Sequence, residues 1–94
     1  MTEPGLEFAY DAVAYPTPIV PELNPARIRA ACALQGFAAP AAAGASVLEI
    51  GCGDGYNLLG IAAASPGAPH IGFDLSAAAI ARGRAVLRTS GLSN

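Results

Sequence analysis

Three alternating glycines, in the stretch Glu49-Ile-Gly51-Cys-Gly53-Asp-Gly55, lie between a short apolar run and a segment with helical spacing. The apolar run, 46–50, has the length and flanking residues of a buried parallel strand. The segment 56–65 repeats its apolar residues at helical spacing and is followed by a Pro-Gly turn. Glycines in such a turn permit positive φ and close approach to a ligand. The stretch therefore predicts a ligand-binding turn within an α/β fold.

Further helix and strand patterns flank this unit. Asn24-Pro25 has the N-cap and first-turn residues of a helix over about 25–35. Residues 70–74 predict a second short strand, and Ser76 can cap a third helix that runs to about Arg88. The order helix, strand, helix, strand, helix implies parallel strands joined by right-handed crossovers. We expect the N-terminal portion of a Rossmann-like doubly wound parallel sheet, and a fragment, because two parallel strands make an unstable open sheet.

The chain divides into two parts by composition. Residues 1–24 form an arm rich in proline and aromatic residues, which include Tyr10 and Tyr15. Residues 25–94 carry the helix and strand patterns and form the predicted partial domain. We hypothesise that the aromatic arm closes over a bound ligand and excludes water.

Composition excludes several classes of protein. Of the 94 residues, 53% are hydrophobic and 13% are charged, so the chain is not intrinsically disordered. Its five arginines and seven acids give a net charge of -2, so we expect no nucleic-acid partner. No apolar run reaches the roughly 18 residues of a spanning helix, and the acidic N-terminus is no signal peptide. These features predict a cytoplasmic protein without a membrane partner.

Two cysteines and one histidine are too few for a usual four-ligand zinc site without acidic ligands. We therefore expect no metal, and reduced thiols at Cys32 and Cys52.

A second acid, Asp74, follows the second strand, 23 residues after Gly51. The carboxyl ends of neighbouring strands in a doubly wound sheet border one crevice, where a carboxylate can accept hydrogen bonds from both hydroxyls of a ribose. The helix after the glycines aims free N–H groups and its positive end at a carboxylate or phosphate. This spacing predicts a cofactor that contains adenosine.

The motif does not fit two common nucleotide-binding loops. The dinucleotide fingerprint G-x-G-x-x-G/A would require its last glycine at Tyr56 or Leu58. The phosphate loop of nucleotide hydrolases requires a lysine, which this chain lacks. The pattern E-x-G-x-G-x-G with a later acid instead resembles motif I of class I S-adenosylmethionine-dependent methyltransferases.

The resemblance implies a role for each motif residue. Glu49 would lie near the methionine amino group of S-adenosyl-L-methionine, often acting through water. Asp74 would bind the ribose hydroxyls, and Leu75 would pack by the adenine. The loop against the methionine part is formed by Gly51, Gly53 and Gly55. Catalytic residues would come from later strands, so none is assigned.

The similarity covers the chain from about Tyr10 to Asn94. It is a similarity to the start of bacterial methyltransferases that carry a methyltransferase regulatory domain, a group that includes protein lysine methyltransferases. Its segments are 10–16, 24–28, 48–58, 72–76 and 91–94. Asn24 departs from the histidine typical of that position. The resemblance implies an enzyme that is inactive as these 94 residues alone, with a protein or small molecule as methyl acceptor. A non-catalytic cofactor-binding or regulatory module is the alternative, and a dinucleotide-dependent oxidoreductase is a weaker one.

Overall fold

The structure, a computed structural model, describes residues 12 and 19–94. Its elements in chain order are a short 3₁₀ helix η1 (Pro21–Leu23), α2 (Pro25–Leu34), β1 (Val47–Ile50), α3 (Tyr56–Ala64), β2 (His70–Phe73) and α4 (Ala77–Ser90). The predicted order from α2 to α4 is confirmed, and each element end lies within about two residues of its predicted position. Most of the predicted arm, 1–24, and both of its tyrosines lie outside the described residues.

The helix ends follow the local chemistry of the sequence. The Asn24 side chain accepts a hydrogen bond from the Ala26 N–H at 2.9 Å, with Pro25 in the first turn of α2. The Ser76 hydroxyl accepts from the Ala79 N–H at 3.1 Å and begins α4. Gly91 ends α4 in the left-handed conformation, at φ 77°. Such caps satisfy backbone groups that have no partner within the helix.

The two strands are parallel and in direct register, from Val47 opposite His70 to Ile50 opposite Phe73. Helix α3 connects them, as a crossover between parallel neighbours requires. The carboxyl ends of both strands therefore meet at one edge of the sheet, where the glycine-rich loop (51–55) begins.

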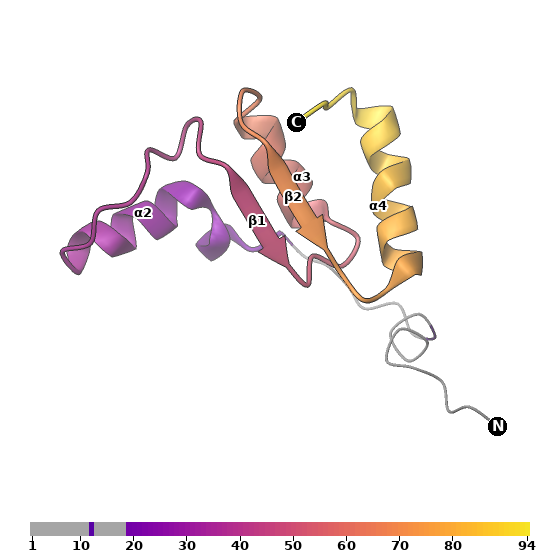
Figure 1. Cartoon of the computed structure of the whole chain (residues 1–94), viewed down its shortest axis with the longest axis horizontal. Helices are drawn as coiled ribbons and strands as arrows, with labels where there is room; N and C mark the ends of the chain where they lie inside the picture. The colour runs from indigo at the N-terminus through magenta and orange to yellow at the C-terminus, as the bar shows by residue number, and fades with distance from the viewer. Residues whose placement is uncertain (1–11, 13–18) are drawn as a thin grey trace.

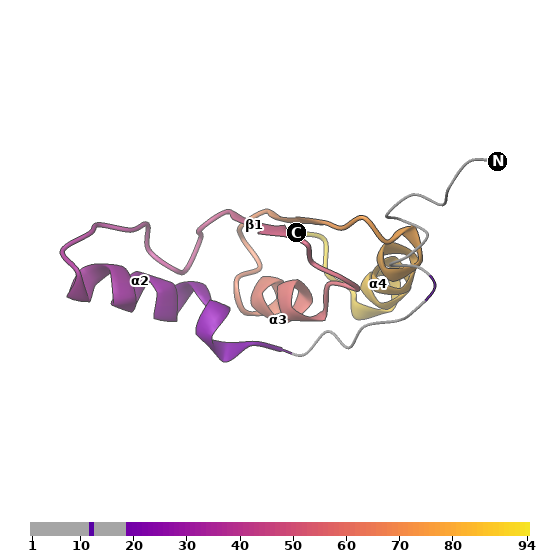
Figure 2. The same ribbon diagram turned by 90° about the horizontal axis from the view of Figure 1, so that it is seen from below.

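All three longer helices lie on one side of this sheet (Figures 1 and 2). On the opposite side, Leu48, Ile50, Ile71 and Phe73 remain between 51% and 74% exposed. We call these four side chains the bare sheet face. The described residues thus form one helix layer and one two-stranded sheet, an arrangement compatible with part of a Rossmann-like fold.

The buried core is small. Its hydrophobic members are Cys52, Ile61, Ala62, Ala68 and Ala79. Most of these side chains are small, so the described part buries little apolar surface on its own.

Asn94 anchors the segment after α4 to the start of β2. Its side-chain amide donates to the carbonyl oxygens of Ala62, Ser65 and Ala68 at 2.9–3.1 Å. Its backbone carbonyl accepts from the His70 N–H at 2.8 Å. The C-terminal segment therefore lies beside the start of β2 (Figure 1).

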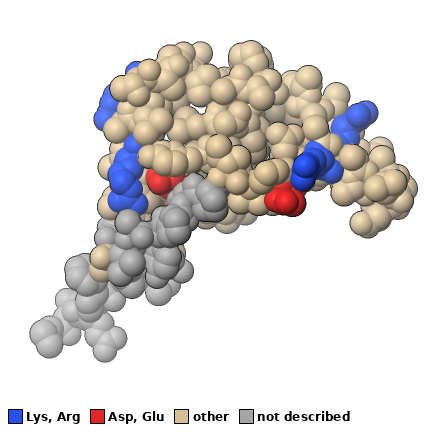
Figure 3. Space-filling view, turned by 180° about the vertical axis from the view of Figure 1, so that it is seen from behind, with Lys and Arg blue, Asp and Glu red and all other residues tan. Residues whose placement is uncertain are grey.

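Seen from behind, blue areas lie on the left and on the right of the described surface, and a red area lies near each (Figure 3). Arginines of α2 and of α4 account for the blue areas. The ion pair between Arg27 and Glu22, at 4.0 Å, is well exposed and contributes little to stability. Within residues 12 and 19–94, no helix is both long and apolar enough to span a bilayer.

Candidate functional site

The glycine-rich loop has its unusual backbone at the positions that the motif predicts. Gly51, Gly53 and Gly55 have φ angles of 71°, 60° and 81°. A residue with a Cβ would be strained in this left-handed region, by roughly 1–2 kcal/mol each. A Cβ built on Gly51 or Gly55 would meet no atom within 4 Å, so the space in front of these two residues is open. The alternating glycines thus provide a bare, sharply folded backbone.

Hydrogen bonds fasten this loop to the end of β2. The N–H groups of Gly51 and Cys52 both donate to the Phe73 carbonyl oxygen, at 2.9 and 3.0 Å. The Gly53 N–H donates to Asp74 Oδ2 at 2.9 Å. The donors of the first three loop residues are therefore used within the protein. Helix α3, which starts on Gly55 without a side-chain cap, provides the N-terminal helix end expected from the sequence.

Asp74, which follows β2, contacts both the glycine-rich loop and the residue that caps α4. Besides the bond from Gly53, its Oδ1 accepts from the Ser76 N–H at 2.9 Å. An ionised carboxylate offers about four acceptor positions, so about two remain after these contacts. Leu75 follows directly and is 51% exposed, which leaves its side chain available for packing.

Glu49 contacts the first turn of α3 and makes its hydrogen bond there. It lies half-buried in β1, where its Oε2 accepts from the side-chain amide of Asn57 at 3.2 Å. Asn57 belongs to the first turn of α3 and is only 4% exposed. The sequence motif gives no role to this residue. The available signal was a polar side chain in the first turn of an otherwise apolar helix.

The Cys52 thiol lies near three carboxylates. Burial raises the pKa of the Cys52 thiol, and the carboxylates of Glu49, Asp74 and Asp54 raise it further. Cys52, which is 3% exposed, is therefore a packed residue whose thiol stays protonated at neutral pH.

Two further glycines allow the surrounding elements to approach. A Cβ on Gly83 of α4 would overlap the carbonyl oxygen of Asp54. A Cβ on Gly72 of β2 would lie 2.8 Å from Leu58 Cδ2 and 2.9 Å from Cys52 Sγ. Both positions press against the loop or its neighbours, and neither was singled out from the sequence.

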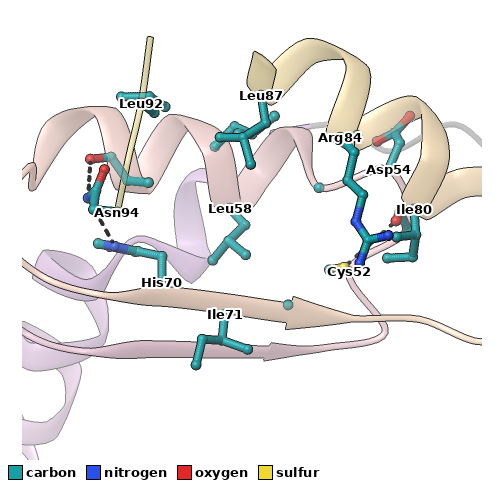
Figure 4. Close-up of a pocket in the computed structure, with 16 residues that line it drawn as sticks. Cys52, Asp54, Leu58, His70, Ile71, Ile80, Arg84, Leu87, Leu92 and Asn94 are labelled. Carbon is teal, nitrogen blue, oxygen red and sulfur yellow. Dashed lines mark hydrogen bonds between the residues drawn. The ribbon is translucent and has the colours of Figure 1, made fainter. Parts of the chain in front are cut away.

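A cavity of about 300 Å³ lies between α3, β2 and α4 (Figure 4). Its middle is apolar, with Leu58 and Leu87, and Arg84 extends from α4 toward the loop end of the cavity. Gly53 and Gly55 line it, whereas Glu49, Asp74 and Leu75 do not. This cavity therefore lies beside the loop, and it does not bring the predicted acids together.

The described part of the chain offers no cluster of three or more His, Cys, Asp or Glu side chains that could hold a metal ion. Asp54 has one buried carboxylate oxygen without a hydrogen-bond partner. It lies in the loop between Gly53 and Gly55, at a position that favours a turn-forming residue.

Comparison with known proteins agrees with this geometry. Residues 41–94, which contain the loop, both strands and α4, match a family described as a methyltransferase domain. The chain is 33% identical over 88 residues to uncharacterized protein RP028 of Rickettsia prowazekii (strain Madrid E), covering 94% of this chain and 35% of the relative. It is 34% identical over 85 residues to uncharacterized protein RP789 of the same organism, covering 90% of this chain and 15% of the relative.

The chain thus spans about a third or less of the length of these relatives. No solved structure gives a significant match. The family match covers more than half of the chain and includes every predicted site residue. The chain therefore belongs to the methyltransferase-domain family.

Proposed function

We propose that this chain forms the S-adenosyl-L-methionine-binding part of a class I methyltransferase, related to the bacterial enzymes with a regulatory domain. The observation that carries the proposal is the charge at the loop. Asp54 lies in the loop, Asp74 accepts a hydrogen bond from the Gly53 N–H, and Glu49 lies in the strand that leads into the loop. A cofactor with a sulfonium and an ammonium group suits these three carboxylates, because both groups are cationic.

The same charge disfavours a dinucleotide. A pyrophosphate is an anion that requires backbone donors and a positive field. Here the N–H groups of Gly51, Cys52 and Gly53 already have partners in β2 and Asp74. These two observations support the methyltransferase over the oxidoreductase alternative.

The residues present fit the adenosine and methionine parts of the cofactor. The open space in front of Gly51 and Gly55 leaves room for the methionine chain against the backbone. The free acceptor positions of Asp74 can receive two ribose hydroxyls. Leu75, exposed beside it, offers an apolar surface for the adenine.

When bound, S-adenosyl-L-methionine supplies an activated methyl group, which transfers by direct displacement at carbon. The chain's own residues bind and orient the cofactor. Asp74 holds its ribose and Glu49 its amino group, and the glycine-rich loop fixes the distance between these two contacts. Alignment of this kind is the main contribution of a protein to a displacement reaction. The methyl acceptor, a protein or a small molecule, and the residues that contact it belong to the proposal for the whole protein.

Titration of the ¹⁵N-labelled chain tests the proposal, because chemical shifts report weak binding as well as tight binding. We expect S-adenosyl-L-methionine to shift the amide signals of the glycine-rich loop and of Asp74, and NADH to leave them unchanged. Shifts with NADH alone would support the oxidoreductase. Absence of shifts with either compound would contradict a cofactor role for the loop.

A further inference from the structure

Asn57 is a buried polar side chain beside the candidate site that the proposed function leaves unexplained. At 4% exposure it has lost nearly all contact with water, so its amide must find partners within the protein. It has two, and they come from separate parts of the chain: Glu49 in β1 and Val20, which precedes η1.

The partners fix the orientation of the amide group. The Val20 N–H is a donor and lies 2.9 Å from Asn57 Oδ1, so this side of the amide must be the oxygen. The Nδ2 group then faces Glu49 Oε2, at 3.2 Å, as a donor to a carboxylate. A reversed amide would place donor against donor and acceptor against carboxylate. The pair of contacts therefore fixes the amide with its donor toward Glu49.

The two contacts also connect distant segments. Val20 and Asn57 are 37 residues apart, and Glu49 lies on the strand before the loop. Glu49 and Asn57 both line a hollow of about 400 Å³ between α2 and β1. Asn57 thus links the backbone of Val20 to the Glu49 carboxylate.

We infer that Asn57 is a positioning residue, which holds the Glu49 carboxylate for the amino group of the cofactor and ties that carboxylate to the N-terminal segment at Val20. The inference rests on the proposed function, because it assigns Glu49 to the amino-acid part of the ligand. It predicts that Asn57 affects ligands that carry this amino group and leaves unaffected those that lack it.

Two ligands separate the role from general stability. S-adenosylhomocysteine carries the amino-acid part, whereas 5′-methylthioadenosine keeps the adenosine and lacks it. N57D is the test variant, since it keeps the size of the side chain and the acceptor for Val20 but replaces the donor to Glu49 by a second carboxylate. N24D is the matched control, because it adds the same charge at the α2 cap, where Asp serves as well as Asn.

We expect N57D to weaken S-adenosylhomocysteine binding to the full chain by about tenfold, the lower end for a lost hydrogen bond to a charged group. Repulsion between the carboxylates at positions 49 and 57 should turn Glu49 away from the ligand, and this displacement should outweigh the added negative charge. Binding of 5′-methylthioadenosine should be unchanged, and N24D should affect neither ligand. Equal weakening of both ligands by N57D, or unchanged S-adenosylhomocysteine binding, would overturn the inference. Failure of the unaltered chain to bind either ligand would instead refute the proposed function.

The double variant E49Q/N57D guards against misfolding of the single variant. It restores the hydrogen bond with reversed polarity, because the amide introduced into β1 can donate to the carboxylate introduced into α3, while Val20 keeps its acceptor. We expect this variant to fold like the unaltered chain and to bind 5′-methylthioadenosine equally well, with S-adenosylhomocysteine binding still reduced. Full recovery of S-adenosylhomocysteine binding would show that the position of the carboxylate does not matter, and would contradict the inference.

Discussion

The close contact of α4 with the glycine-rich loop predicts that alanine substitutions at two glycines change the free energy of unfolding in opposite directions. Gly83 lies in α4, and a Cβ there would overlap the Asp54 carbonyl oxygen and come within 3.0 Å of its carbonyl carbon. Gly60 lies in α3, and a Cβ there would meet nothing within 4 Å. Both are helical, so the gain in helix propensity from Gly to Ala is the same at each position. The difference between the two variants therefore measures the contact with Asp54.

The free energies of unfolding follow from two effects. Alanine in place of a helical glycine stabilises by about 1 kcal/mol, which is the whole effect expected for Gly60→Ala. Overpacking costs roughly 1–3 kcal/mol. The upper end applies at Gly83, because the neighbour is backbone and cannot rotate away. Gly83→Ala should therefore destabilise by about 2 kcal/mol, and the two variants should differ by about 3 kcal/mol.

Urea unfolding followed by far-ultraviolet circular dichroism provides both values. The loop should also move, so Gly83→Ala is expected to shift the amide signals of Gly53 and Asp74, whereas Gly60→Ala leaves them in place. If Gly83→Ala proves as stable as Gly60→Ala, α4 does not press on the loop, and the packing argument is refuted.

Three further predictions concern single features of the structure. Asp74→Ala should weaken 5′-methylthioadenosine binding by about 1–3 kcal/mol, measured by titration, because it deletes a hydrogen-bonded charge at the proposed ribose site; unchanged affinity would exclude that site. Iodoacetamide at pH 8 should alkylate Cys32 well before Cys52, as measured by peptide mass spectrometry. Burial and nearby carboxylates raise the pKa of the Cys52 thiol and keep it protonated. Faster reaction at Cys52 would contradict this. The double variant I50T/I71T should remain soluble at higher concentration than the unaltered chain, as judged by light scattering, because both side chains lie on the bare sheet face at 74% and 62% exposure; equal aggregation would assign the cause to another surface.

The order and ends of the elements could be predicted because the sequence marks them locally. Asn24-Pro25, Ser76 and Gly91 each satisfy or terminate backbone hydrogen bonding within a few residues of themselves. The glycine positions of the loop could be predicted for the same reason, since a left-handed φ is a property of one residue. Local chemistry sufficed for these features.

The contacts of the site could not be predicted, since they depend on which residues lie opposite one another after folding. The bonds from Gly51 and Cys52 to the Phe73 carbonyl require the register of β1 and β2, which the sequence does not state. The role of Gly83 arises from packing of α4 on a loop far earlier in the chain, and that of Asn57 from contacts with two separate segments. No local pattern contains that information.

The arrangement at the loop also changes how its glycines are understood. A glycine-rich turn before a helix is usually explained by free N–H groups that bind an anion. In this chain, the donors of the first three loop residues bind the end of β2 and Asp74 instead, so they fix the loop in place. Under the proposed function, the ligand preference comes from the side chains beside the bare backbone, among them Glu49, Asp54 and Asp74. A turn of the kind that elsewhere binds an anion would then receive a cationic cofactor, because acids lie beside it.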